Sequence, residues 1–97
     1  MNLTIHPGAQ SDLDEAAEFS RNTADVALSK SFLEGFDQSS AMLQRYPQLG
    51  SCWRSGRRRL VMQRFPYSII YSVSADEIRI LAVAHQSRRP NYWRQRK

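Results

Sequence analysis

One stretch of the sequence, ILAVAHQSRRPNYW (80–93), starts as a buried strand and ends in side chains that could do chemistry. His85 has an ordinary pKa near neutrality, which suits proton transfer, and it stands where the apolar strand ends. Arg88 and Arg89 could grip phosphate or carboxylate, and Tyr92 and Trp93 could stack on bases. Structural roles compete with these: we favour a His85 ring that hydrogen-bonds nearby backbone at the strand end, and a Trp93 ring that folds back on the sheet.

A second group of basic residues precedes this stretch. Arg57, Arg58 and Arg59 follow Gly56 at the start of an expected strand. Because side chains alternate along a strand, these three cannot all grip one phosphate. They predict a patch for nucleic acid or for an acidic protein segment, or else an edge strand that is charged against aggregation. Arg94 extends the basic surface near the C-terminal end.

The charge is unevenly divided between the two halves of the chain. Residues 1–44 hold seven acidic and two basic side chains, a net charge of about −5. Residues 45–97 hold twelve basic side chains, eleven of them arginine, against Asp76 and Glu77, a net charge of about +10. Planar guanidinium groups suit bidentate binding of phosphate, so a polyanionic partner is expected; the alternative is a solvated face that aids solubility.

Length and composition limit the other possibilities. A chain of 97 residues with 41% hydrophobic residues predicts one domain, residues 1–97, with a small core. We expect no membrane-spanning segment and no signal peptide, and therefore a cytoplasmic location. The lone Cys52 can form neither an internal disulfide nor a zinc site, so we expect no metal and no cofactor.

The pattern of apolar residues predicts the elements that position these side chains. Residues 2–6 read as a short strand that ends at Pro7 and Gly8. Residues 9–21 repeat apolar residues at helical spacing, and so does a longer segment that follows Asn22 and Thr23 and stops at the YPQLG segment, 46–50. Two helices so joined form an antiparallel hairpin.

The period then changes from helical to alternating. Strands are expected over 57–65, over 67–73 with alternate residues on one face, and over 78–84, a nearly unbroken apolar run. Such a run predicts a central strand that is covered on both faces. The fold class is therefore α+β: a strand, a helical hairpin and a three-strand antiparallel run that completes a curved sheet, followed by a short C-terminal segment.

Four segments, in this order, resemble the RelE/ParE superfamily of bacterial toxins. They are DLDEAAEF (12–19), YPQLG (46–50), RFPYSIIY (64–71) and ILAVAHQSRRPNYW (80–93). The resemblance covers nearly the whole chain and implies a toxin of a type II toxin–antitoxin system. Such a toxin is neutralised by an antitoxin encoded beside it and arrests growth when the antitoxin is degraded.

The resemblance implies one of two targets. RelE-like members cut messenger RNA, usually on the ribosome, whereas ParE-like members poison DNA gyrase. RNA cleavage needs a base, a cation and an acid. In RelE-like toxins, which this chain resembles, arginines and a C-terminal tyrosine fill these roles. At the two positions where the family has an arginine, this chain has Ser68 and Gln86. Tyr92 matches the tyrosine, and His85 or Arg88 could supply a missing group.

Gyrase inhibition is the favoured expectation, because two cations of the nuclease pattern are absent. An mRNA endonuclease, with His85, Arg88 and Tyr92 as catalytic residues, is the second. A non-toxic basic domain that binds nucleic acid or protein is the third. Under the first reading, Arg57, Arg58, Arg59, Arg88, Arg89 and Arg94 bind the target. We also expect an antitoxin segment that folds as it binds in the groove between the helical hairpin and the sheet.

Overall fold

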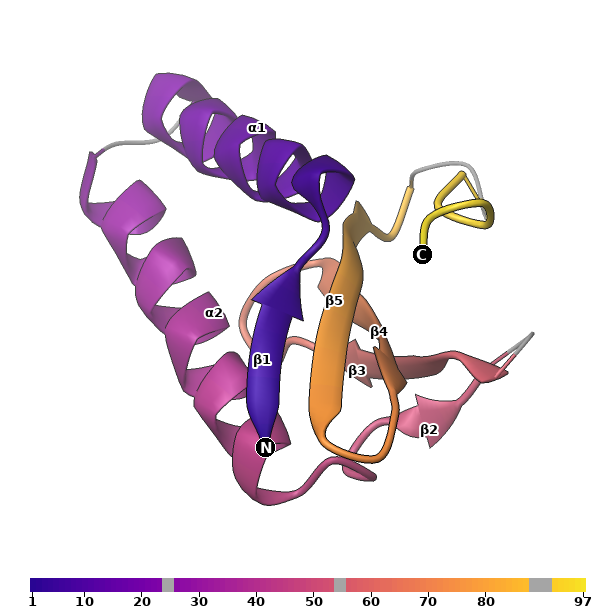
Figure 1. The fold of residues 1–97 in the computed structure, drawn as a ribbon. Helices are drawn as coiled ribbons and strands as arrows, with labels where there is room; N and C mark the ends of the chain where they lie inside the picture. The colour runs from indigo at the N-terminus through magenta and orange to yellow at the C-terminus, as the bar shows by residue number, and fades with distance from the viewer. Residues whose placement is uncertain (24–25, 54–55, 88–91) are drawn as a thin grey trace.

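The computed structural model describes residues 1–23, 26–53, 56–87 and 92–97, and in these ranges the chain forms two helices and one five-stranded sheet. The elements are Asn2–Ile5 (β1), Pro7–Thr23 (α1), Val26–Arg45 (α2), Ser51–Cys52 (β2), Arg58–Val61 (β3), Tyr67–Val73 (β4) and Glu77–His85 (β5). The strand order is β1-β5-β4-β3-β2 (Figure 1). β1 runs parallel to β5, and the other neighbours are antiparallel.

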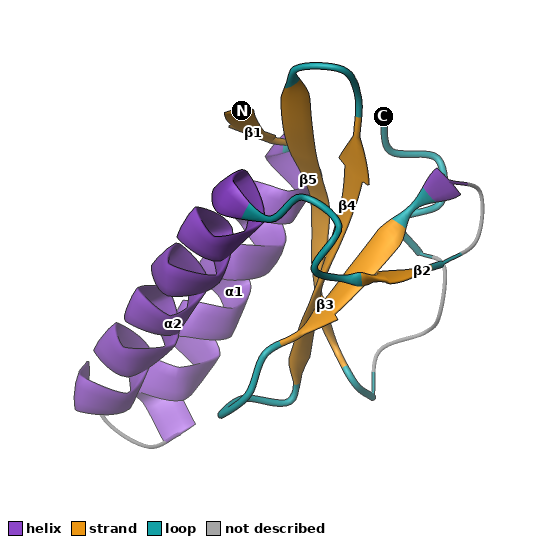
Figure 2. Ribbon diagram, turned by 90° about the horizontal axis from the view of Figure 1, so that it is seen from below, coloured by secondary structure: helices purple, strands orange, loops and turns teal. Residues whose placement is uncertain are grey.

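The two helices cover one face of the sheet, and the C-terminal segment lies on the other (Figure 2). The main core lies between helices and sheet because each contributes an apolar face: Leu13, Ala16 and Ala17 from α1, Phe32, Phe36 and Leu43 from α2, and Ile69, Tyr71, Ile78, Ile80 and Val83 from the sheet. A smaller cluster on the opposite face joins Ile70, Ala82 and Trp93. We call this opposite side, which also carries Arg59 and Ser68, the tail face.

β5 is the central, doubly covered strand that its apolar run predicts. Ile78, Ile80 and Val83 belong to the core beneath the helices, whereas Ala82 packs against Trp93. Trp93 is 5% exposed, so the prediction that its ring folds back on the sheet is confirmed. A register shift next to Ile70 interrupts the pairing of β4 with β5. Burial on both sides fixes this strand, and with it the position of the side chains that follow its end.

The α+β order and the helical hairpin expected from the sequence are confirmed, with two differences in the strands. β3 ends at Val61 instead of 65, because the Met62 N–H bonds to the Tyr67 carbonyl and closes the β3–β4 connection. The segment after Gly50, expected to be a loop, contains β2, which pairs with Arg58 and Arg59. A two-residue strand has too little periodicity to be recognised from sequence.

The end of α2 is tied to the sheet by Tyr71. Its hydroxyl donates to the Pro47 carbonyl at 2.9 Å and accepts the Gly50 N–H at 2.9 Å. A Cβ at Gly50 would lie 2.7 Å from that hydroxyl and 2.8 Å from the Arg59 carbonyl oxygen, so only glycine fits this approach. Burial raises the pKa of Tyr71, which keeps the phenol protonated and able to donate.

Candidate functional site

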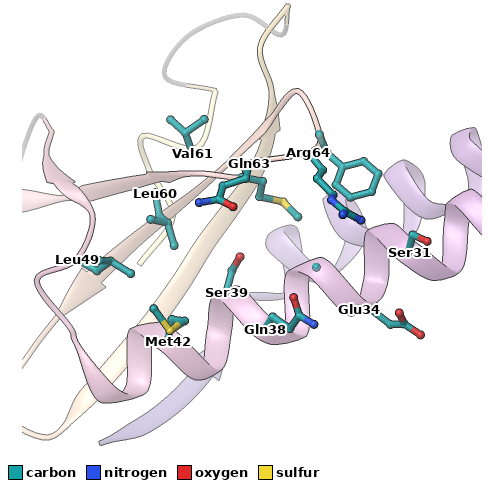
Figure 3. A pocket seen from close by; sticks show the side chains of 13 residues that line it. Ser31, Glu34, Gln38, Ser39, Met42, Leu49, Leu60, Val61, Gln63 and Arg64 are labelled. Carbon is teal, nitrogen blue, oxygen red and sulfur yellow. The ribbon is translucent and has the colours of Figure 1, made fainter.

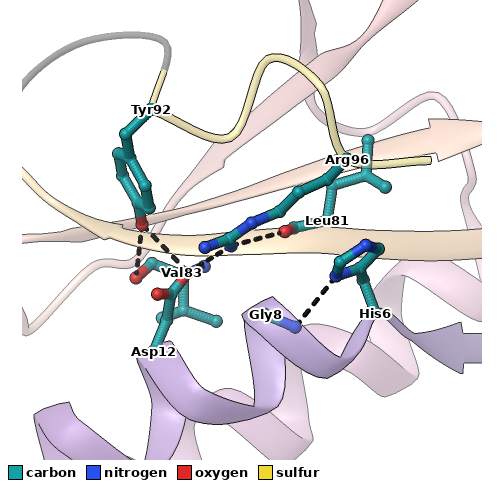
Figure 4. Close-up of polar contacts among 7 residues, drawn as sticks. All are labelled: His6, Gly8, Asp12, Leu81, Val83, Tyr92 and Arg96. Carbon is teal, nitrogen blue, oxygen red and sulfur yellow. Dashed lines mark hydrogen bonds and ion pairs between the residues drawn. The ribbon is translucent and has the colours of Figure 1, made fainter.

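A buried carboxylate joins α1, β5 and the C-terminal segment. Oδ2 of Asp12 accepts hydrogen bonds from the Val83 N–H at 3.2 Å, the Tyr92 hydroxyl at 2.9 Å and Nη1 of Arg96 at 2.8 Å (Figure 4). The same Arg96 nitrogen donates to the Leu81 carbonyl at 2.9 Å. Asp12 is 5% exposed, and the guanidinium neutralises its charge within the fold. We call Asp12, Tyr92 and Arg96 the Asp12 cluster.

The sequence places Asp12 in this position through helical spacing. Asp12 follows Ala9 by three residues and precedes Ala16 by four, and both alanines are buried, so its side chain shares their face. Neither burial nor a functional role was predicted for Asp12 from the sequence. The spacing to the two alanines was the available signal.

The start of α1 is shaped to receive Arg96. A Cβ at Gly8 would lie 2.6 Å from the guanidinium carbon of Arg96, so the missing side chain leaves room for that group. The Gly8 N–H donates to Nδ1 of His6 at 2.9 Å. Burial, with the positive charges of Arg79 and Arg96, lowers the pKa of His6, and the negative charge of Asp12 partly opposes this. The His6 ring thus serves the local fold.

Tyr92 is thus placed as a structural clamp. Its hydroxyl donates to Asp12 and lies 3.4 Å from the Val83 carbonyl, and its ring lies 5.1 Å from the guanidinium carbon of Arg96. The Tyr92 hydroxyl and the Arg96 guanidinium both donate hydrogen bonds to the same buried carboxylate, so this phenol has a structural role in the fold. This arrangement orients the C-terminal segment on the tail face.

His85, at the end of β5, is held by its neighbours. Its Nδ1 accepts the Ser87 N–H at 3.0 Å and lies 2.7 Å from the Ser87 hydroxyl, and its ring packs edge-on against Tyr67 at 5.0 Å. These contacts are those of the structural alternative, a ring bonded to nearby backbone. His85 also lines a pocket of about 320 Å³ between α1 and β5, together with Asp12 and Glu15. Arg88 and Arg89, expected beside it, lie outside the described residues.

Arg57, Arg58 and Arg59 go to different places, as strand alternation predicts. Arg58 donates from Nη1 to the Gly50 carbonyl at 2.7 Å, towards the end of α2. Arg57 donates from Nη2 to the Arg96 carbonyl at 3.2 Å. Arg59 points across the tail face to β4. Two of the three arginines therefore also hold the fold together.

Arg59 contacts position 68, one of the two positions where the nuclease pattern has an arginine. Ser68 is buried, and its hydroxyl accepts a hydrogen bond from Nε of Arg59 at 3.1 Å. The Arg59 guanidinium carbon also lies 5.1 Å from the ring centroid of Trp53, which is 38% exposed. Gln86, the other position where an arginine was expected, is exposed and bonds to the Pro66 carbonyl through its backbone N–H. Arg94 is exposed beside Trp93.

A larger groove runs between α2 and β3 (Figure 3). Its volume is about 580 Å³, and two of its apolar side chains remain well exposed: Met42 (45%) and Leu49 (46%). Glu34 and Arg64 also line it. Large apolar side chains gathered at one groove mark a surface that a partner can cover.

The described part of the chain offers no group of three or more His, Cys, Asp or Glu side chains that could hold a metal ion. Within those same ranges, neither helix is apolar and long enough to cross a bilayer.

Comparisons with known proteins agree with this architecture. The model of a family described as "ParE toxin of type II toxin-antitoxin system, parDE" matches residues 3–90. Among solved structures, the chain is similar to one described as "Chromosomal ParDE TA system from P. aeruginosa", with a TM-score of 0.78 and 23% identity, over 88% of this chain and 95% of that chain. At this identity the likeness concerns the fold. The comparison with curated proteins gives no match.

Proposed function

Since this chain belongs to the family of ParE toxins of type II toxin–antitoxin systems, we propose that it arrests growth by binding DNA gyrase and that a cognate antitoxin neutralises it. The Asp12 cluster is the observation that favours gyrase over RNA as the target. In it, the Tyr92 hydroxyl and the Arg96 guanidinium are both bonded to one buried carboxylate. A toxin whose C-terminal tyrosine hydroxyl is bonded in this way acts by binding its target and not by catalysing a reaction on it.

Cleavage of RNA makes demands that these side chains meet poorly. It needs an acid and a base that can exchange protons with substrate, and a cation at the developing charge. The Tyr92 hydroxyl donates its hydrogen bond to Asp12, and position 68 carries a buried serine. The nuclease alternative would then depend on His85 alone for proton transfer. Gyrase inhibition needs no proton transfer by the toxin, so the same side chains suit it.

Single substitutions separate the two mechanisms in cells. For a toxin that acts by contact, Tyr92→Phe and His85→Ala each leave growth arrest largely intact, because no one contact carries the whole interaction. For a nuclease, loss of a general acid or base lowers cleavage roughly a hundredfold or more and abolishes toxicity. Growth after induction without antitoxin, at matched levels of folded protein, is the measurement. Rescue of growth by Tyr92→Phe alone, with transcripts intact only in that variant, would contradict the proposal.

The groove between α2 and β3 is the proposed antitoxin site. Met42 and Leu49 expose apolar surface there, and burial of apolar surface drives most association of this kind. A segment that folds on binding can cover such a groove on a small protein. We expect apolar anchors in that segment and acidic residues that complement the basic second half of the chain.

A matched pair of leucines tests this site. Leu49→Asp places a charge in the groove, whereas Leu33→Asp places the same charge on α2 outside the groove, at a side chain that is 38% exposed. Burying an unpaired carboxylate is costly, so Leu49→Asp should weaken the toxin–antitoxin complex at least tenfold, and Leu33→Asp should leave it unchanged. Calorimetric titration of each variant with the cognate antitoxin measures this. Equal affinities for the two variants would place the antitoxin elsewhere.

The proposal also places the toxin in the cytoplasm, since gyrase acts there on chromosomal DNA. A toxin exported from its cell could not reach this target. Fractionation after induction, with the tagged chain followed by immunoblot, tests the location, and recovery of the toxin mainly in the periplasm or membrane would contradict it.

A further inference from the structure

On the tail face, the guanidinium group of Arg59 is fixed in orientation and can still bind a ligand. Nε of Arg59 donates to the buried Ser68 hydroxyl, and the guanidinium lies against the ring of Trp53. These two contacts fix the plane of the group. Within the described residues, they are the contacts that Arg59 makes through its guanidinium, so its two terminal nitrogens keep their hydrogen-bonding capacity. A planar fork held in this way suits a phosphate, which it can bind with two parallel hydrogen bonds.

The surroundings of Arg59 are also basic. The bond from Arg57 to the Arg96 carbonyl brings the start of β3 against the C-terminal segment, which carries the exposed Arg94 and Lys97. Of the two acids of the second half, Asp76 lies in the connection between β4 and β5, and Glu77 is the first residue of β5. The sheet and tail together therefore present positive charge with an aromatic ring, Trp53, at its edge.

We propose that the tail face binds the phosphate backbone of DNA, with Arg59 as the central phosphate contact. The inference rests on the proposed function in one respect: DNA is chosen as the polyanion because the substrate of gyrase is DNA. A toxin that contacts both would engage the enzyme where it holds its DNA. The net charge of +5 gives general attraction, and the oriented guanidinium gives a defined contact.

Direct binding to DNA, without gyrase, tests the inference. The probe is a fluorescently labelled duplex of roughly 30 base pairs, titrated with the purified full chain at several salt concentrations. Three variants are compared with the wild type: Arg59→Gln, Arg59→Lys and Arg64→Gln. The last removes the same charge from the α2–β3 groove and is the matched control. Circular dichroism verifies that each variant is folded.

The expected result is specific to Arg59. Loss of one phosphate contact lowers the slope of log affinity against log salt by about 0.9 and weakens binding roughly five- to tenfold at ~0.1 M salt. Arg59→Gln should show this loss, Arg59→Lys should retain most of the salt slope, and Arg64→Gln should resemble the wild type. Equal effects of Arg59→Gln and Arg64→Gln would overturn the inference, because they would show a diffuse charge effect. Tighter binding of an RNA of equal length would overturn it too.

Parallel gyrase assays separate the two proposals. Gyrase inhibition by a wild-type chain that does not bind the duplex overturns the inference and leaves the proposed function standing. Duplex binding that depends on Arg59, in a chain that leaves gyrase unaffected, supports the inference and overturns the proposed target.

Discussion

Replacing Asp12 by asparagine tests the structural role of the Asp12 cluster. The substitution keeps the size of the side chain and removes its charge. One oxygen of Asp12 accepts three hydrogen bonds, from the Val83 N–H, the Tyr92 hydroxyl and Nη1 of Arg96. Asparagine can retain an acceptor there, but it leaves the Arg96 guanidinium without its counter-charge.

The magnitude follows from the burial of the ion pair. The side chain of Asp12 is 4% exposed and that of Arg96 is 20% exposed. Breaking a fully buried pair by changing one partner costs about 3–5 kcal/mol, and the partial exposure of Arg96 reduces this to about 2–3 kcal/mol. For a domain of this length each kcal/mol lowers Tm by about 4–8 °C, so a drop of roughly 10–20 °C is expected.

Asp14 provides the control. It lies two residues along α1, is exposed, and accepts one hydrogen bond, from Gln10 at 3.0 Å. Asp14→Asn should change Tm by no more than a few degrees, because exposed polar contacts contribute little. Thermal unfolding followed by circular dichroism compares the two variants with the wild type. If Asp12→Asn and Asp14→Asn unfold at the same temperature, the Asp12 cluster does not hold the C-terminal segment as described.

Two further predictions concern other parts of the fold. Gly50→Ala should lower the free energy of unfolding in urea by about 2 kcal/mol, because its Cβ would displace the Tyr71 hydroxyl, which would then lose its bonds to Gly50 and Pro47; unchanged stability would refute the close approach. Because the pKa of His6 is lowered on folding, the unfolded chain binds its proton more readily, so stability should fall as pH drops through 6.5 towards the lowered folded value. His6→Gln should remove this part of the pH dependence, and identical profiles for His6→Gln and the wild type would contradict it.

Secondary structure was predictable where apolar periodicity ran long enough. The two helices and β5 each carry a sustained pattern, and their residues pack as that pattern indicates. The position of Trp93 followed from the general tendency of aromatics to cover sheets. β2 was missed because two residues carry no period, and β3 was expected to be longer because a loose alternation of polar and apolar residues continues past Val61 to Phe65.

The Asp12 cluster lay beyond prediction for a different reason. Asp12 and Arg96 are 84 residues apart in sequence, and no local pattern links a helix residue to the penultimate residue of the chain. Tyr92 would face a substrate only under the nuclease alternative, and the fold turns its hydroxyl onto Asp12. Such pairings depend on tertiary packing, so they emerge only once helix and tail are placed together.

Inhibition of purified gyrase tests the central claim most directly. The full chain is titrated into a supercoiling reaction that contains gyrase, relaxed plasmid and ATP, and in parallel into a reaction with translating ribosomes and a defined transcript. The account predicts a concentration-dependent loss of supercoiling by the wild type and by Tyr92→Phe, with the transcript left uncut. Undisturbed supercoiling, together with cleavage of the transcript that Tyr92→Phe abolishes, would contradict it.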